Sequence, residues 1–259
     1  SFEQLVVANP TLVYCAITGY GEDGPWAARP AHGLQPDLCA GAVPIDWTDG
    51  VPKIPAGYKA HGATLAGLWA ALGITAGLLR RPVLNAAQYV SVSLWEAALA
   101  WMWREGVNDL NGLDQRPDFQ ELGSRYRMYV GSDSAAILVC PTEEKFWVRF
   151  VDELGLPESW RSIGDWTTGA DNGFGREQEA AAIAERIATA PAHEWDARLT
   201  AAGVPVAVVQ SVGDAYRSPQ AVARGSTVRV DGQDGAVYIP LSPLSVSAAE
   251  RLSDGSVVR

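Results

Sequence analysis

A glycine-rich stretch directly after an apolar run constrains the fold of this chain more than any other feature. Residues 12–17 read Leu-Val-Tyr-Cys-Ala-Ile, which predicts a buried strand. Gly19, Gly21 and Gly24 follow in the spacing G-x-G-x-x-G, and in dinucleotide-binding folds a helix begins directly after these glycines. Pro30 lies where its ring would interrupt such a helix. The stretch therefore predicts a strand that ends in a glycine-rich loop rather than a dinucleotide site.

Composition excludes several classes of protein. Hydrophobic residues make up 47% of the 259 residues and charged residues 19%, which is typical of a globular chain with a sizeable core. The net charge of −10 argues against a nucleic-acid partner. The three cysteines form no C-x-x-C pair, so we expect reduced thiols, a cytoplasmic location and, for Cys15, a small buried side chain.

The longest apolar stretch, residues 63–79, falls just short of a membrane span and contains two threonines and three glycines. We therefore expect a buried core helix and no membrane partner. The chain opens at Ser1 with an amphipathic segment that leads into the first strand. This opening is typical of the middle of a domain, and we expect the chain to be a segment of a longer polypeptide.

The sequence falls into two parts with different patterns of predicted secondary structure. The first is α/β: its pattern predicts a strand at 12–17, a helix at 64–81 that Pro82 ends, a strand at 88–94 and a helix at 95–103. The second is a smaller α+β part, with predicted strands at 126–130, 135–140, 204–209, 227–230 and 236–239, and helices at 143–154, 176–188, 192–202 and 215–224. Residues 108–117 read as a linker between them.

Several motifs together resemble the family III CoA transferases, which include the related α-methylacyl-CoA racemases. They are residues 9–21 with Gly24-Pro25, the helix residues 67–74, the strand 88–94, and Gly-Val-Pro-Val-Ala at 203–207, followed by residues 218–225. The resemblance runs through nearly the whole chain in order. It implies acyl-CoA and a carboxylic acid as substrates, with coenzyme A as the carried group.

The resemblance also implies an architecture. Residues 1–107 would be part of a large Rossmann-like domain, 118–240 a small α+β domain, and 241–259 a return toward the large domain. The family fold implies an interlocked homodimer, or a second copy of the unit in the same longer polypeptide. The N-terminal half of the large domain is not found in this sequence. The glycine loop, with Gly19, Gly21 and Glu22, would border the CoA cleft.

The family's transferases use an aspartate at the start of the helix predicted at 64–81, as a nucleophile that forms a covalent intermediate. Counting back from Gly67 places this position on Ala63, and no carboxylate stands at residues 60–67. Asp37, Asp46 and Asp49 in the preceding loop are candidates for a displaced carboxylate, although each is also typical of surface charge.

The racemase branch uses a histidine, an aspartate and a glutamate for proton exchange at the α-carbon. His32 and Glu143 match the histidine and glutamate positions, and His61 is the titratable group near the missing aspartate. Each has a structural alternative: His32 as a solvated loop residue, and Glu143 and His61 at helix N-termini.

Two further residues are candidates for the CoA site. Lys59 could neutralise a CoA phosphate, and Glu22 in the glycine loop would need a hydrogen-bond donor beside its charge. The three histidines show no metal-ligand spacing, so no metal is expected. Three hypotheses remain: an acyl-CoA transferase, a racemase-like enzyme using His32 and Glu143, and a catalytically silent half of a two-copy transferase.

Overall fold

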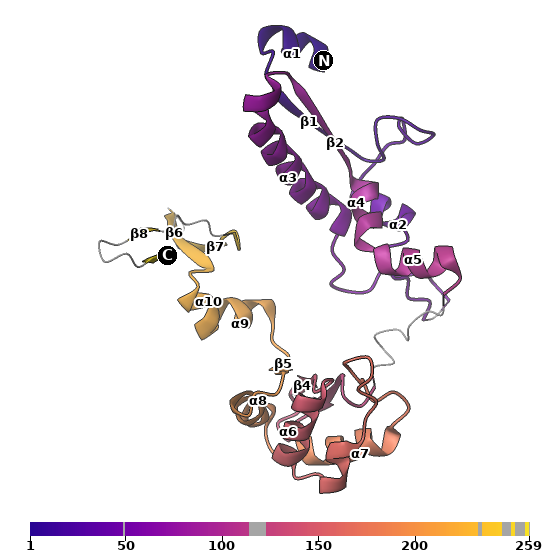
Figure 1. Cartoon of the computed structure of the whole chain (residues 1–259), viewed down its shortest axis with the longest axis vertical. Helices are drawn as coiled ribbons and strands as arrows, with labels where there is room; N and C mark the ends of the chain where they lie inside the picture. Colours follow the sequence, from indigo (N-terminus) through magenta and orange to yellow (C-terminus); the bar gives the residue numbers. More distant parts are fainter. Residues whose placement is uncertain (49, 114–122, 233–234, 245–249, 252–256, 259) are drawn as a thin grey trace. The chain divides into compact units, whose positions relative to one another are not determined.

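The structure is a computed structural model that describes residues 1–48, 50–113, 123–232, 235–244, 250–251 and 257–258. The chain forms two compact units, Ser1–Arg116 and Pro117–Arg259, which are described separately (Figure 1).

Unit 1 is built around two parallel strands joined by a long helix. Its elements are α1 (Phe2–Ala8), β1 (Val13–Thr18), α2 (Gln35–Cys39), α3 (His61–Leu84), β2 (Gln88–Ser93), α4 (Leu94–Trp101) and α5 (Trp103–Asn111). β1 and β2 pair in parallel from Val13 opposite Gln88 to Thr18 opposite Ser93. Helix α3 makes the crossover and lies along both strands (Figure 1). The predicted strand, glycine loop, helix and strand are therefore confirmed as one βαβ unit.

Close packing against the strands explains two of the four glycines in α3. A Cβ added at Gly73 would lie 2.5 Å from Val90 Cγ1, and one at Gly77 would lie 2.8 Å from Val13 Cγ1. The helix can approach the strands only because these positions lack side chains. Gly67 has no atom within 4 Å of an added Cβ, so packing does not explain it.

Helix α3 ends later than the sequence predicts. It continues through Pro82 to Leu84, and Asn85 closes it in the left-handed conformation with φ 45°. The expectation that Pro82 stops the helix is wrong. Proline fits the helical φ, and the Asn85 N–H still donates to the Arg81 carbonyl at 3.0 Å.

Most of α3 is not buried within the described chain. Leu68, Leu72 and Leu79 are 66%, 57% and 76% exposed, so the expected buried core helix is not what the structure shows. By length and composition alone, α3 could cross a membrane, which is weak support for a membrane span because core helices of soluble proteins pass the same test.

The helix predicted at 95–103 is instead two helices, α4 and α5, which meet at Met102. Ser93 caps α4, its hydroxyl accepting from the Glu96 N–H at 3.1 Å. Helix α5 extends to Asn111, which lies inside the range expected to be a linker.

Unit 2 contains a three-stranded antiparallel sheet and helices that pack on it. Its elements are β3 (Arg127–Val130), β4 (Ala136–Val139), α6 (Glu144–Leu154), the 3-10 helix η2 (Glu158–Ser162), α7 (Glu177–Ile187), α8 (Ala192–Ala201), β5 (Val206–Val208), α9 (Val212–Arg217), α10 (Pro219–Ala223), β6 (Thr227–Gly232), β7 (Gly235–Pro240), β8 (Glu250–Arg251) and β9 (Val257–Val258). The strand order is β3-β4-β5, and β6 pairs with β7 as a separate hairpin. The α+β character predicted for this part is confirmed.

The core of unit 2 lies between the sheet and helices α6, α7 and α8. Its fully buried side chains include Ile137, Val139, Trp147, Phe150, Ile183, Ile187 and Leu199. Each fully buried apolar side chain of this size contributes roughly 1.5–3 kcal/mol relative to its exposed state.

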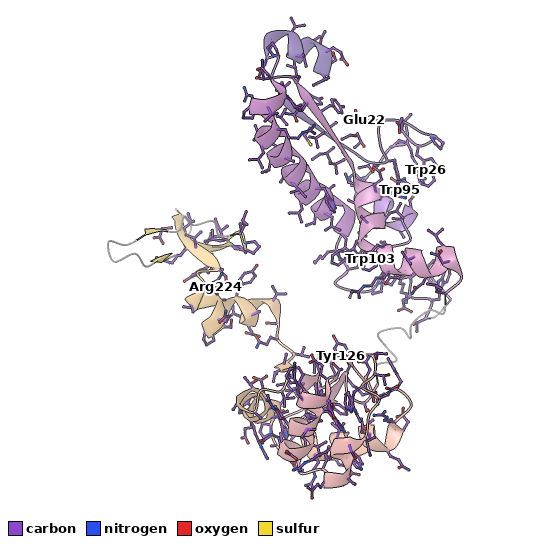
Figure 2. The ribbon with its side chains drawn as sticks, in the orientation of Figure 1. Glu22, Trp26, Trp95, Trp103, Tyr126 and Arg224 are labelled. Carbon is purple, nitrogen blue, oxygen red and sulfur yellow. The ribbon has the colours of Figure 1, made fainter. Side chains whose placement is uncertain are left out.

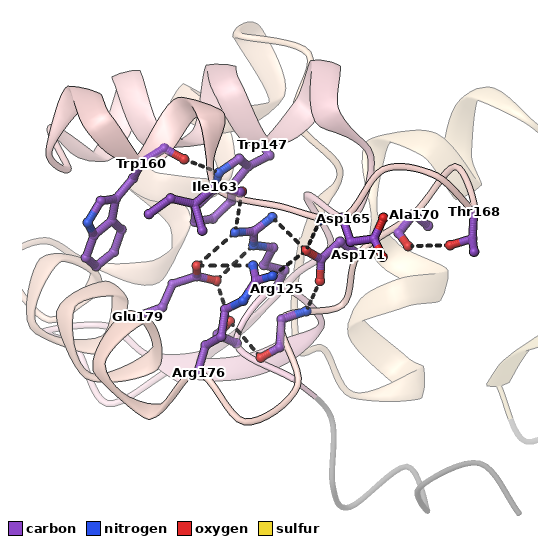
Figure 3. A network of polar contacts seen from close by, with 12 residues as sticks. Arg125, Trp147, Trp160, Ile163, Asp165, Thr168, Ala170, Asp171, Arg176 and Glu179 are labelled. Carbon is purple, nitrogen blue, oxygen red and sulfur yellow. Dashed lines mark hydrogen bonds and ion pairs between the residues drawn. The ribbon is translucent and has the colours of Figure 1, made fainter. Parts of the chain in front are cut away.

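A charged network is buried beside this core (Figure 3). The Arg125 guanidinium is 0% exposed, donates from Nε and Nη2 to the Glu179 carboxylate at 2.9 Å each, and lies 3.6 Å from the Trp147 ring centre. Asp171 lies 3.6 Å from Arg125 Nη1 and accepts from Arg176 at 2.6 Å. Because each charge has an opposite charge beside it, burial of the group is tolerated.

Candidate functional site

The first turn of α3 binds a carboxylate that comes from another element. The helix has no acidic residue of its own in this turn, and its N-cap, Ala60, makes no side-chain capping bond. Asp37 of α2 supplies the missing acceptor, since its Oδ1 accepts from the Gly62 N–H at 2.7 Å. A carboxylate is favoured at this place by the partial positive charge of the helix N-terminus.

The side chain of Asp37 is buried, so the expectation of a surface charge at this residue is wrong. It is 1% exposed, and Oδ2 has no hydrogen-bond partner among the described residues. Burying a carboxylate with so few hydrogen-bond donors lowers the stability of the fold. Carboxylates in such surroundings are found preferentially at functional sites. The sequence offered Asp37 only as one of three loop carboxylates, with Asp46 and Asp49, and did not distinguish it from them.

Gly62 permits this contact because it has no side chain. A Cβ there would lie 2.9 Å from Asp37 Oδ1 and 2.6 Å from the Leu94 carbonyl oxygen. Both the α2 carboxylate and the start of α4 therefore approach α3 at the same residue.

His61 and Tyr58 lie at the same turn. The His61 ring centre is 5.1 Å from that of Tyr58 and 5.7 Å from that of Trp101, and His61 Nδ1 is buried without a hydrogen-bond partner in the described chain. Burial and, secondly, the charge of Asp37 raise the pKa of the Tyr58 hydroxyl. The structure thus places His61, a predicted site residue, and Asp37 at the same turn. Asp37 was one of the three candidates for a displaced carboxylate.

Ala63 is the third residue of α3 and is exposed. It is the position that the sequence count assigns to the nucleophile. The helix therefore presents an exposed position without a reactive side chain here, while the Asp37 carboxylate, which accepts from the adjacent Gly62 N–H, is buried.

The glycine loop holds Glu22 at the side of β2. The Tyr89 hydroxyl donates to its Oε1, and the Ser91 hydroxyl donates to its Oε2 at 2.8 Å. These bonds, that of Tyr89 first, hold the pKa of Glu22 below its usual range, and the same bond raises the pKa of Tyr89 to about 12. The predicted need of Glu22 for a donor is confirmed. Gly21 donates its N–H to Thr18 Oγ1 at 3.0 Å, which closes the turn after β1.

The other residues of unit 1 predicted for the site make no described contact with Asp37 or His61. His32 and Lys59 are exposed. Asp46 is an exposed loop residue whose carboxylate accepts from Thr48 at 2.7 Å. Asp49 lies outside the described residues.

Glu143 belongs to unit 2 and directly precedes α6. Its side chain makes no capping bond, and it pairs with Lys145 at 2.7 Å instead. Among the described residues, no group of three His, Cys, Asp or Glu side chains is placed to hold a metal ion.

A family model and several relatives match this chain. The model of CoA-transferase family III matches residues 1–254. An acetyl-CoA:oxalate CoA-transferase from Acetobacter aceti is 22% identical, over 95% of this chain and 63% of its own length. A succinate–glutarate CoA-transferase from Agrobacterium fabrum is 28% identical, over 91% of this chain and 59% of its own length. The chain thus spans about three fifths of these relatives.

Solved structures show the same fold. Rv3272 from Mycobacterium tuberculosis superposes with a TM-score of 0.77 at 20% identity, covering 95% of this chain and 65% of that one. A CAIB/BAIF family protein from Brucella suis gives a TM-score of 0.68 at 21% identity, covering 100% of this chain and 66% of that one. The α/β architecture predicted for the chain is therefore confirmed as that of this group of proteins.

Proposed function

Since this chain belongs to CoA-transferase family III, we propose that it moves coenzyme A between carboxylic acids, with its reacting group at the first turn of α3. The match of the family model to residues 1–254 carries the proposal. Relatives named for transfer to oxalate and between succinate and glutarate support an acyl-CoA donor and a carboxylic acid acceptor.

Asp37 is the proposed nucleophile. Of the described carboxylates, it is the one hydrogen-bonded to the first turn of α3, beside the position that Ala63 occupies. The Gly62 N–H holds Oδ1, which leaves Oδ2 without a described partner. Because Asp37 is buried and Oδ2 has no described partner, few hydrogen bonds at this oxygen have to be broken before it attacks.

The reaction proceeds through two kinds of intermediate. Oδ2 of Asp37 attacks the thioester carbonyl carbon and the C–S bond breaks. CoA leaves as the thiolate, and the acyl group remains on Asp37 as a mixed anhydride. The thiolate attacks the Asp37 carbonyl carbon, which releases the first acid as a carboxylate and leaves CoA as an Asp37 thioester. The second acid attacks this thioester, CoA leaves again, and its attack on the new acyl group restores Asp37 and gives the new acyl-CoA.

This role requires α2 to move, because Asp37 is 1% exposed in the described chain. Helix α2 has only five residues and lies between Gly33 and Gly41, whose φ angles are +55° and +70°. Such glycines favour chain reversals on both sides of the helix.

Proton transfer by His32 and Glu143 has weaker support. Glu143 pairs with Lys145, and His32 is an exposed loop residue with no side-chain partner among the described residues. The third hypothesis, a silent half, would follow if Asp37 proved inert. A homodimer or a second copy of the unit, and a cytoplasmic location, belong to the same proposal as the transferase activity.

A transfer assay tests the proposal. The chain is incubated with succinyl-CoA and a labelled acid, and label in the CoA thioester is measured. We expect transfer by the unsubstituted parent chain and by Asp46→Asn, a control carboxylate in the segment that follows α2, and none by Asp37→Asn. The asparagine carbonyl can still accept from the Gly62 N–H, so folding should be preserved, as checked by thermal melting. Undiminished transfer by the folded Asp37→Asn variant would contradict the assignment.

A further inference from the structure

The Arg29 guanidinium contacts two aromatic rings. Its guanidinium carbon lies 5.1 Å from the Tyr20 ring centre and 5.0 Å from that of Trp26. The residue is exposed, and its guanidinium makes no hydrogen bond or ion pair with any described residue. An arginine stacked in this way is oriented in advance, while its N–H donors remain available to a ligand.

The aromatic rings beneath Arg29 are themselves fixed. Trp26 meets Tyr20 and Trp95 edge-on, with ring centres 5.5 Å apart in each pair. Figure 2 shows Trp26 and Trp95 close together near the start of α4. The Trp95 indole N–H donates to the Cys39 carbonyl at 3.3 Å. The guanidinium therefore has a rigid support rather than a mobile one.

This support lies at the carboxyl end of the parallel strands. Tyr20 follows β1, and Trp95 stands at the start of α4, directly after β2. The Trp95 backbone N–H donates to the Gly19 carbonyl at 3.1 Å, which joins the ends of the two strands. In open α/β sheets this edge is where ligands bind.

Two other arginines of unit 1 lie at the opposite end of the βαβ unit. Arg80 and Arg81 lie in the last turns of α3, and Arg81 donates to the Thr11 hydroxyl just before β1. Glu22, the acid in the glycine loop, is engaged by the hydroxyls of Tyr89 and Ser91. Arg29 thus brings an uncompensated positive charge to the end of the layer where the site lies.

We propose that Arg29 binds the unreacted carboxylate of a dicarboxylic acid, both in the free acid and in its CoA thioester. The inference rests on the proposed CoA transfer. When one carboxyl of such an acid is joined to CoA, the other keeps its negative charge. The planar guanidinium matches a carboxylate with two parallel hydrogen bonds, which a monocarboxylic acid of the same length cannot form at that end.

Two variants and one control test the role of Arg29 in transfer. The expected result for Arg29→Gln is that kcat/KM with succinate as acceptor falls about 10- to 100-fold, as for a lost hydrogen bond to a charged group. With butyrate it should change less than about twofold, because that acid has no second carboxylate. Arg29→Lys should be intermediate, since it keeps the charge but not the fork. Arg80→Gln removes the same charge at the far end of α3 and should match the parent chain.

A binding measurement separates failure of this inference from failure of the proposed function. Trp26 reports on ligands at Arg29, so succinate should change the tryptophan fluorescence of the parent chain and not of Arg29→Gln, whether or not transfer occurs. No response of the parent chain to succinate would overturn the inference. So would an equal fall in kcat/KM for succinate and butyrate, or weaker binding of free CoA by Arg29→Gln, which would assign the residue to a CoA phosphate. Absence of transfer to any acid, with the succinate response intact, would overturn the transferase and leave the Arg29 site standing.

Discussion

The two units differ in how completely each buries its own apolar side chains. In unit 2, Trp147, Phe150 and Leu199 are fully buried around one core. In unit 1, α3 leaves Leu68 and Leu79 mostly exposed within the described chain. Stability is therefore concentrated in unit 2. The first turn of α3 in unit 1 holds two buried polar atoms without a hydrogen-bond partner among the described residues, Asp37 Oδ2 and His61 Nδ1, and buried atoms of this kind are frequent at functional sites.

The largest expected effect on this contrast comes from the buried network of unit 2. Arg125→Ala leaves the Glu179 carboxylate buried without its main partner, so we expect a loss of about 3–5 kcal/mol in the free energy of unfolding. Denaturant unfolding followed by tryptophan fluorescence measures it. Arg161→Ala, which removes an exposed partner of Asp152, is the control and should cost about 0–1 kcal/mol. Equal effects of the two variants would show that the network contributes no more than a surface pair.

A pair of leucines compares the two units directly. Leu199→Ala creates a cavity in the core of unit 2 and should cost about 2–5 kcal/mol. Leu79→Ala, at a position that is 76% exposed, should stay within about 0.5 kcal/mol of the parent chain. The same denaturant experiment serves both variants. A loss of several kcal/mol in Leu79→Ala would mean that the exposed face of α3 is covered in solution.

Two glycines in α3 probe the packing of unit 1. At Gly73 an added methyl group would meet Val90, so Gly73→Ala should destabilise the chain by about 1–3 kcal/mol. At Gly67 the space is open, and Gly67→Ala should stabilise the helix by up to about 1 kcal/mol. Thermal melting of both variants tests the signs. Opposite signs would support the packing of α3 on β2, and two stabilising substitutions would refute it.

The smallest expected effect is a pH dependence in unit 2. Burial alone would raise the pKa of Asp171, but the N–H groups of Asp165 and Gly173, together with Arg176, outweigh it and hold the pKa below its usual value. A lowered folded-state pKa means that this contribution is present above the unfolded pKa and is lost as pH falls through the folded one.

Unfolding midpoints of the parent chain should therefore fall as the pH is lowered below about 4. Asp171→Asn should have a lower midpoint near neutral pH and a shallower decline in acid. Parallel pH profiles for the two proteins would show that Asp171 does not contribute to the loss of stability in acid.

The sequence predicted the regular parts of the fold well, because their patterns are local. Apolar runs and helical apolar spacing predicted β1, α3 and β2. The burial of Asp37 was missed, since nothing near residue 37 in the sequence shows that α2 packs against the start of α3, 25 residues further along the chain. The stacking of Arg29 also depends on residues brought together only by the fold.

The central claim is that a carboxylate from α2 replaces the one missing at position 63. The most direct test is intact-mass spectrometry with peptide mapping after incubation with succinyl-CoA, applied to the parent chain, Asp37→Asn, and Asp37→Asn combined with Ala63→Asp. We predict an acyl or CoA adduct on Asp37 in the parent chain, none in Asp37→Asn, and an adduct at residue 63 in the double variant, where the helix presents an exposed position. An adduct that persists in Asp37→Asn, or a parent chain that forms none, would contradict the claim.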